Sequence, residues 1–230
     1  MNILDIRNEL EKDLTWRHEE MRLLDNQLSS IVKEEDKNRY RKSLIVMLYA
    51  HYEGFCKTAL TIYANAINSE GLKCAETTDC ITAASLATIF KDFNNISKKS
   101  RIFNKDLPDD TQLHSFARQT ELISNLHDIW KTNVNIPIEI IDVESNLKPI
   151  VMRKILFRLG FPYDAFEKHE GDIHNLLIHR NRIAHGDKKD GIEQKDYEKV
   201  EKATYRIMDE LILLIMDALT NTIYLKKSTP

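Results

Sequence analysis

The stretch IHRNRIAHGD, at residues 178–187, places an arginine and a histidine at a spacing that could act on a phosphate group. On a helix with about 100° per residue, Arg180 falls on the apolar stripe. The other members of that stripe are Ile173, Leu176, Leu177 and Ala184. Burying an unpaired guanidinium is costly, so Arg180 requires an anionic partner or an open cleft. The alternatives are a structural ion pair or a side chain that extends out to solvent.

His185 stands at the end of this stretch, directly before Gly186, where we expect the helix to stop. A histidine at this position can serve simply as a helix cap. Asn181 lies four residues earlier, so its amide could hydrogen-bond the imidazole ring and fix the tautomer. Arg180 and His185 are five residues apart, which separates them by roughly 140° around an ideal helix. They converge only if the arginine reaches around the helix or if a second chain brings its own copy opposite.

Helices are the elements expected to position these side chains. The 230 residues include only six glycines and five prolines, and so few helix breakers predict long uninterrupted helices. Hydrophobic periodicity places them at about 3–32, 36–68, 111–131, 144–159, 172–185 and 194–226, with a short helix at 82–90. We expect Asp172 to be the N-cap of the fifth long helix. Residues 133–142 are expected to be extended, and 98–101 and 107–110 to be loops.

The fold class predicted from this pattern is all-α, as a helical bundle in a single domain of residues 1–230. The helix at 36–68 is apolar on two faces, which is typical of a central helix packed on both sides. The core of the bundle is expected to comprise about 1–68 and 144–226. Residues 69–143 would then form an insertion between the second helix and the C-terminal helices.

Composition limits the partners of the protein. The net charge of −3 excludes general attraction of nucleic acid to the whole surface, so any contact would need a local basic patch. Arg182 lies on the polar side of its helix and, with Lys188 and Lys189, could contact RNA phosphates; the alternative is that these are solvated charges. The three cysteines form no CxxC pair, and the longest apolar run is too short for a membrane span. We expect a cytoplasmic protein with reduced thiols and no membrane partner.

No motif indicates a metal site or another cofactor. His169, His174 and His179 do not share one helical face, and the chain has no HExxH motif. It also lacks a GxxxxGK[ST] loop, a GxGxxG fingerprint and a GxSxG elbow. We therefore expect no cofactor.

Glu53 is a second candidate for the site. It lies between Tyr49 and Cys56 on the second apolar face of the central helix, where a carboxylate needs a cation. Arg180 is the partner we expect, because such a pair would orient the guanidinium in advance. The alternative is a structural salt bridge elsewhere.

The segment Arg180-Asn181-Arg182-Ile183-Ala184-His185 resembles the R-x4-6-H motif of the HEPN superfamily, which carries a polar residue directly after the arginine. Its surroundings are similar too: a helix late in an all-α domain, followed by a loop and a long terminal helix. The segment LYAHYEGFCK, at 48–57, resembles the second helix of several prokaryotic HEPN families. The resemblance covers roughly 1–68 and 144–226, and 69–143 would be a family-specific insertion.

This resemblance implies metal-independent RNA cleavage by a homodimer in which two such motifs face each other. Attack by the RNA 2′-OH needs a base, an acid and a cation near the phosphate. By this analogy, His185 would transfer protons and Arg180 would hold the scissile phosphate. Asn181 would orient His185 or contact the phosphate, and Glu53 would support the site. The products would be a 2′,3′-cyclic phosphate and a 5′-OH, and the setting a toxin–antitoxin or anti-phage defence system.

Two alternatives remain from the sequence. The chain could be a catalytically silent helical module that binds RNA or a protein partner. It could also be a DNA-directed nuclease or the nuclease subunit of a larger defence complex. HEPN toxins that pair with a nucleotidyltransferase antitoxin carry a tyrosine shortly after the motif histidine, whereas Gly186, Asp187 and Lys188 follow here. If an antitoxin or other defence partner exists, we therefore do not expect it to act through that tyrosine.

Overall fold

The computed structural model describes residues 1–97, 99 and 110–227, and this part of the chain is helical with no β-strand. The α-helices are α1 (Ile3–Leu28), α2 (Glu34–Ser69), α3 (Asp79–Ser85), α4 (Ala87–Asn94), α5 (Thr111–Lys131), α6 (Pro149–Arg158), α7 (Glu170–Ala184) and α8 (Gln194–Thr220). Short 3-10 turns lie at Cys74–Glu76, Ile138–Ile140 and Glu167–His169. The predicted all-α class is confirmed.

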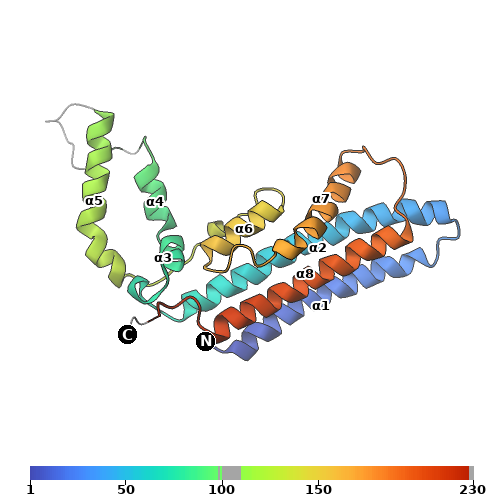
Figure 1. Ribbon diagram of the computed structural model, residues 1–230, viewed down its shortest axis with the longest axis horizontal. Helices are drawn as coiled ribbons and strands as arrows, with labels where there is room; N and C mark the ends of the chain where they lie inside the picture. The colour runs from blue at the N-terminus through green and yellow to red at the C-terminus, as the bar shows by residue number, and fades with distance from the viewer. Residues whose placement is uncertain (98, 100–109, 228–230) are drawn as a thin grey trace.

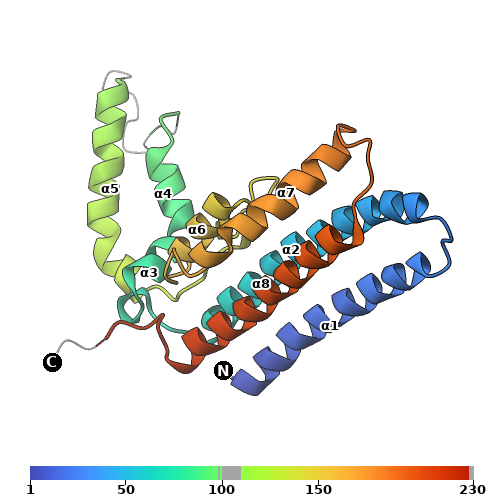
Figure 2. The ribbon, with the colours of Figure 1, turned by 45° about the vertical axis from the view of Figure 1, so that its right-hand side comes forward.

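The bundle is built around α2. Helices α1 and α8 run alongside it, and α7 packs against both α2 and α8 (Figures 1 and 2). The largest side chains of α2, including Tyr52, Phe55 and Tyr63, are fully buried. These three aromatics share one face, and Tyr49, Cys56 and Leu60 on a second face are buried as well, as expected for a central helix with packing partners on both sides. This arrangement presents α7, which carries Arg180, along the outside of the central helix.

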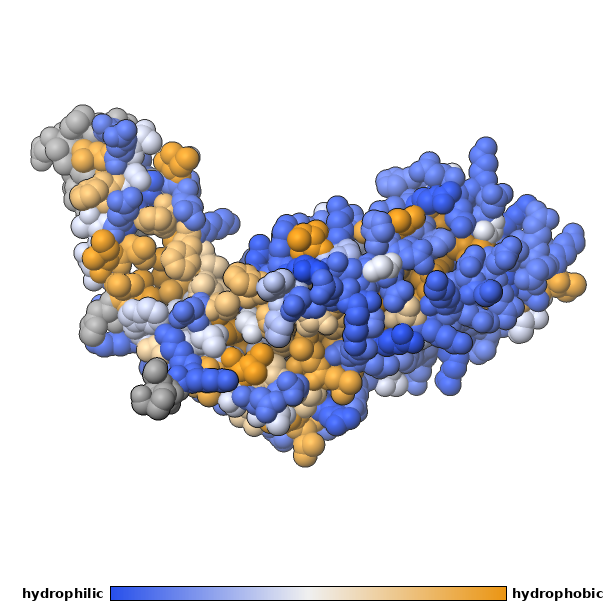
Figure 3. Space-filling view, in the orientation of Figure 1, coloured by the Kyte–Doolittle hydropathy of each residue, from blue (hydrophilic) through white to orange (hydrophobic). Residues whose placement is uncertain are grey.

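Helices α4 and α5 form an arm that projects away from the bundle (Figure 1). Main-chain hydrogen bonds close its base, from Cys74 N to Thr132 O at 2.9 Å and from Val134 N to Leu72 O at 2.8 Å. None of the α4 residues is buried, and hydrophobic side chains gather on the surface of the arm (Figure 3). The arm lies within the predicted insertion, 69–143.

Several predicted boundaries differ from the structure. The expected helix at 82–90 is two helices, α3 and α4, which are separated at Leu86. The helix expected from 144 begins at Pro149 because Glu144 and Ser145 have φ angles of 49° and 67°, which are incompatible with a right-handed helix. Helix α7 begins two residues before the predicted cap Asp172, and its N-cap is His169. The loops predicted at 98–101 and 107–110 fall almost entirely outside the described residues.

Other expectations agree closely with the structure. The helix predicted at 111–131 has the bounds of α5, and α2 begins and ends within two residues of the predicted 36–68.

The end of the terminal helix differs from the prediction, because α8 stops at Thr220 and not at 226. Within the described ranges, no helix is both long enough and apolar enough to cross a membrane.

Candidate functional site

Arg180 lies half-buried on α7 and is held by neutral groups. Its Nη1 donates hydrogen bonds to Oδ1 of Asn146 at 2.9 Å and to Oδ1 of Asn181 at 2.8 Å. Its guanidinium carbon lies 4.9 Å from the centroid of the Tyr49 ring, a cation–π distance. Two amide oxygens and an aromatic face therefore surround the guanidinium, and they fix its orientation without neutralising its charge.

The rest of the guanidinium remains available. In the described part of the chain, Nε and Nη2 of Arg180 make no hydrogen bond. Two adjacent guanidinium N–H groups match the geometry of two oxygens of a phosphate or carboxylate. Arg180 thus keeps the edge that would bind an oxyanion.

Glu53 does not make the ion pair with Arg180 that the sequence suggested. Its Oε2 accepts a hydrogen bond from the Tyr49 hydroxyl at 2.6 Å and one from the backbone N–H of Leu147 at 3.1 Å. No direct Glu53–Arg180 salt bridge occurs among the residues described. The reason is local: Tyr49 precedes Glu53 by one helical turn on α2, so its hydroxyl reaches the carboxylate first.

Tyr49 connects α2 to the turn that carries Asn146. Its hydroxyl also accepts a hydrogen bond from Leu147 N at 2.9 Å. Burial, followed by the hydrogen bond to Glu53, raises the pKa of Tyr49 well above its ordinary value, so the phenol stays protonated and remains a donor. Neither Tyr49 nor Asn146 was predicted from the sequence to be a site residue. The position of Tyr49 one turn before Glu53 was a local signal for Tyr49, whereas Asn146 gave none.

Asn181 contacts the arginine rather than the histidine. Its side-chain oxygen accepts from Arg180, and no hydrogen bond joins that amide to the His185 ring within the described residues. Only the Asn181 backbone carbonyl reaches residue 185, accepting from His185 N at 2.9 Å. In the structure Asn181 therefore does not orient His185, because its amide oxygen is hydrogen-bonded to the neighbouring guanidinium.

His185 is exposed at the C-cap of α7. The helix stops as predicted at Gly186, which has a φ of 76° and donates its N–H to Ile183 O at 3.1 Å. A positive φ is easily adopted by glycine, which is why helices commonly end at this residue. The imidazole makes no hydrogen bond to any described residue, so both ring nitrogens are accessible to a ligand.

The loop after His185 is fastened to the start of α2. Lys42 Nζ donates to the Lys188 carbonyl at 2.8 Å, and Ile192 N donates to Asn38 O at 2.8 Å. A Cβ on Gly191 would lie 2.3 Å from Asn38 Cβ, so only glycine allows this close approach. Of the three predicted RNA contacts, Arg182 and Lys189 are exposed and Lys188 is half-buried.

The other histidines of this region have separate surroundings. His169 is buried, with Nε2 at 2.9 Å from Glu210 Oε2. His174 is exposed, and burial lowers the pKa of the half-buried His179. Over the described ranges, no group of three or more His, Cys, Asp or Glu side chains is arranged to hold a metal ion.

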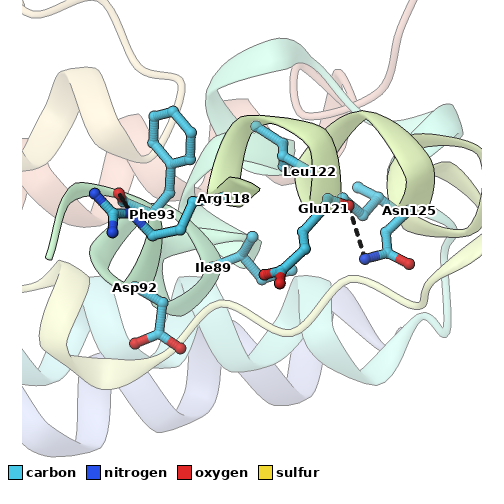
Figure 4. A pocket seen from close by; sticks show the side chains of 8 residues that line it. Ile89, Asp92, Phe93, Arg118, Glu121, Leu122 and Asn125 are labelled. Carbon is cyan, nitrogen blue, oxygen red and sulfur yellow. Dashed lines mark hydrogen bonds between the residues drawn. The ribbon is translucent and has the colours of Figure 1, made fainter. Parts of the chain in front are cut away.

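A separate groove of about 320 Å³ lies between α4 and α5 (Figure 4). Its lining is Ile89, Asp92, Phe93, Arg118, Glu121, Leu122, Asn125 and Ile129. Arg118 Nε donates to the Phe93 carbonyl at 3.0 Å, and Asn125 donates to the Glu121 carbonyl at 2.8 Å. None of the predicted site residues lines this groove.

Comparison with protein families identifies the frame that holds Arg180 and His185. The family model for MAE_28990-like HEPN domains matches residues 6–224. The chain belongs to the HEPN superfamily. No curated protein and no solved structure matched the chain. HEPN proteins are often ribonucleases, so membership points to a nuclease or RNA-related function.

In this HEPN chain, the two motif residues have complementary properties. Arg180 has a guanidinium held by hydrogen bonds from one side, and His185 is an exposed imidazole at the C-cap of the same helix. A separation of five residues turns them roughly 140° apart around α7. On an ideal helix, one protomer would therefore direct these two side chains to different sides.

Proposed function

We propose that this HEPN protein is a metal-independent endoribonuclease that cleaves RNA by attack of its own 2′-OH. The observation that supports the proposal is the set of contacts around Arg180 and the two donors that they leave free. A guanidinium held by two amide oxygens and an aromatic ring, with its Nε and Nη2 donors available, is suited to bind a phosphate. Among the described residues no carboxylate pairs with Arg180, so its charge is not used in a structural salt bridge.

The reaction assigns a role to each motif residue. A neutral His185 accepts the 2′-OH proton while the 2′-oxygen attacks the adjacent phosphorus, and the P–O5′ bond breaks. A protonated histidine donates a proton to the departing 5′-oxygen. Arg180 stabilises the charge that accumulates on the non-bridging phosphate oxygens. The products are a 2′,3′-cyclic phosphate and a 5′-OH, and no metal ion takes part.

The proposed site is formed by a homodimer. The reaction needs one histidine as base and another as acid, whereas each chain supplies one exposed histidine at the end of α7. A two-fold axis beside α7 would bring two copies of Arg180 and His185 into one cleft. Arg182, Lys188 and Lys189 would flank the cleft and contact RNA phosphates. By family resemblance, the setting is a toxin or an anti-phage effector with a partner protein.

The test is RNA cleavage in EDTA by the wild-type protein, Arg180→Ala and His185→Ala. Loss of a general acid–base group or of a transition-state cation costs about 100-fold or more, so both variants should fall at least that far. His174→Ala is the matched control, because His174 is exposed on the same helix, and it should retain full activity. Wild-type protein that binds RNA but does not cleave it would indicate the binding-module alternative.

A second candidate function is that of a nuclease subunit in a larger complex. The exposed apolar side chains of the arm support it. On α5, Phe116 is 66% exposed and Ile123 is 71% exposed. Large apolar side chains gathered on a projecting arm are typical of a protein interface. Co-purification of a partner that is lost in the Phe116→Ser, Ile123→Ser double variant would favour this candidate.

A further inference from the structure

We propose that Tyr49 and Asn146 are positioning residues that set the direction in which Arg180 presents its guanidinium edge to the scissile phosphate. This inference rests on the proposed function and adds two residues to it. Together with the Asn181 amide, they form a neutral clamp around one end of the guanidinium.

The clamp consists of three contacts, two to one nitrogen of the guanidinium and one to its face. Asn146 Oδ1 and Asn181 Oδ1 both accept from Nη1, while the Tyr49 ring lies against the guanidinium at 4.9 Å. Asn181 is the neighbour of Arg180 on α7, but Tyr49 belongs to α2 and Asn146 to the turn before α6. Contacts from three separate segments remove the rotational freedom of a long side chain before any substrate arrives, and such preorganisation lowers the cost of reaching the reactive geometry.

Because the clamp is neutral, it leaves the positive charge of Arg180 unpaired. A carboxylate bound to Arg180 would compete with a phosphate for the same N–H groups and offset its charge. The nearby carboxylate, Glu53, is instead occupied by the Tyr49 hydroxyl and by Leu147 N. Arg180 is thus held in place while its charge remains available to a phosphate.

Tyr49 also holds the turn that delivers Asn146. Its hydroxyl accepts from Leu147 N at 2.9 Å, directly beside Asn146. Two preceding residues, Glu144 and Ser145, have the positive φ angles of 49° and 67°, and non-glycine residues adopt this conformation only where surrounding contacts hold them. The ring of Tyr49 therefore positions Arg180 directly, and its hydroxyl does so through the turn.

The variants that test the clamp separate these contributions. Asn146→Ala removes the acceptor and should lower kcat by roughly 10- to 100-fold, as expected for a misplaced catalytic group. Asn146→Asp keeps an acceptor but adds a charge, so kcat should partly recover while KM rises. Tyr49→Phe keeps the ring and removes one of the two hydrogen bonds that hold Leu147 N, the other being to Glu53, so it should resemble Asn146→Ala in a milder form. The matched controls Asn65→Ala and Tyr163→Phe, both at exposed positions, should leave kcat and KM unchanged.

A second readout needs no activity. The NMR signal of the Arg180 Nε–H group, assigned by its loss in Arg180→Lys, reports the mobility of the guanidinium. It should be rigid in the wild type and mobile in Asn146→Ala and Tyr49→Phe. Should Tyr49→Phe fail to fold, Asn146→Ala carries the test, because its side chain lies on a half-buried turn.

The two readouts distinguish the two proposals. Wild-type protein that cleaves no RNA, but whose Arg180 signal loosens in Asn146→Ala, would refute the proposed function and leave the clamp standing. Active wild-type protein whose Arg180 signal stays rigid in both variants would overturn the clamp, whatever their activity.

Discussion

The guanidinium carbon of Arg180 lies 4.9 Å from the centroid of the Tyr49 ring, and Glu53 binds the hydroxyl at the far end of that ring. The carboxylate therefore acts on the arginine through a tyrosine and not by a salt bridge. Because no anion offsets its charge directly, Arg180 can bind a phosphate while it is still held in one orientation.

Glu53→Gln tests this indirect role. The glutamine amide oxygen can accept from both the Tyr49 hydroxyl and Leu147 N, so the turn should stay in place with weaker, uncharged hydrogen bonds. We expect a loss of about 1 kcal/mol in unfolding free energy and, if the same energy is lost in the transition state, a fall in kcat/KM of less than about 10-fold. Urea unfolding and RNA cleavage check the two effects. Activity as low as that of Arg180→Ala would show that the negative charge of Glu53 acts directly at the site.

Gly186→Ala tests the helix end that presents His185. Nothing lies within 4 Å of a Cβ built on Gly186, so its φ of 76° is the only source of cost. A left-handed alanine costs about 1–2 kcal/mol, which should lower Tm by roughly 2–8 °C in a chain of this size and reduce cleavage.

Gly171→Ala is the control for this change. Gly171 lies in the first turn of α7, and its added Cβ would also meet nothing within 4 Å. Since it lacks the positive φ, alanine there should leave Tm equal or slightly higher. Equal melting curves for Gly186→Ala and the wild type would contradict the importance of this helix stop.

Lys188 and Lys189 are expected to contribute to RNA affinity through phosphates. Replacing both with alanine should make the plot of log K for RNA binding against log salt concentration less steep. The slope should change by about 0.7 for each RNA phosphate that a lysine no longer neutralises. Fluorescence anisotropy follows the titration, and every protein in it carries His185→Ala so that the RNA is not cleaved. Lys57→Ala, at an exposed position on α2, should leave the slope unchanged. An unchanged slope in the double variant would mean that these lysines are solvated charges only.

Glu201 predicts a pH dependence of stability away from the proposed site. The Tyr197 hydroxyl lies 2.9 Å from Asp25 Oδ1 and 3.0 Å from Glu201 Oε1. Burial, and then the nearby Asp25, raises the pKa of Glu201 from 4.5 to about 7. As pH rises, the Glu201 carboxyl keeps its proton to a higher pH in the folded protein than in the unfolded chain. The stability that comes from binding this proton is therefore lost as pH rises from about 4.5 to 7.

Urea unfolding between pH 4.5 and 8 measures this contribution. Glu201→Gln should weaken the decline, and the difference between the two proteins removes the contribution of histidines common to both. Parallel stability curves for the two proteins would contradict the raised pKa.

Much of the helical frame was predictable because its signals are local. Apolar periodicity identified α2, α5 and α7, and a single glycine identified the end of α7 next to His185. The boundary of α6 was missed because Glu144 and Ser145 adopt left-handed conformations that neither residue type favours. Only their surroundings in the fold determine that turn.

The partners of Arg180 depend on contacts between distant segments. The sequence showed that Glu53 and Arg180 each needed a partner, but it could not show that Tyr49 stands between them. Asn146 gave no local signal, because its role depends on Leu147 being bound to α2. Asn181 was predicted to orient His185 or to contact the phosphate, and its amide oxygen is bound to Arg180 and not to His185.

The most direct test of this mechanism compares one RNA with its 2′-deoxy counterpart in EDTA and identifies the ends of the products. We predict that only the RNA is cut, leaving a 2′,3′-cyclic phosphate and a 5′-OH. Cleavage of the deoxy strand, a requirement for a divalent metal ion, or products with a 5′-phosphate would contradict attack by the RNA 2′-OH.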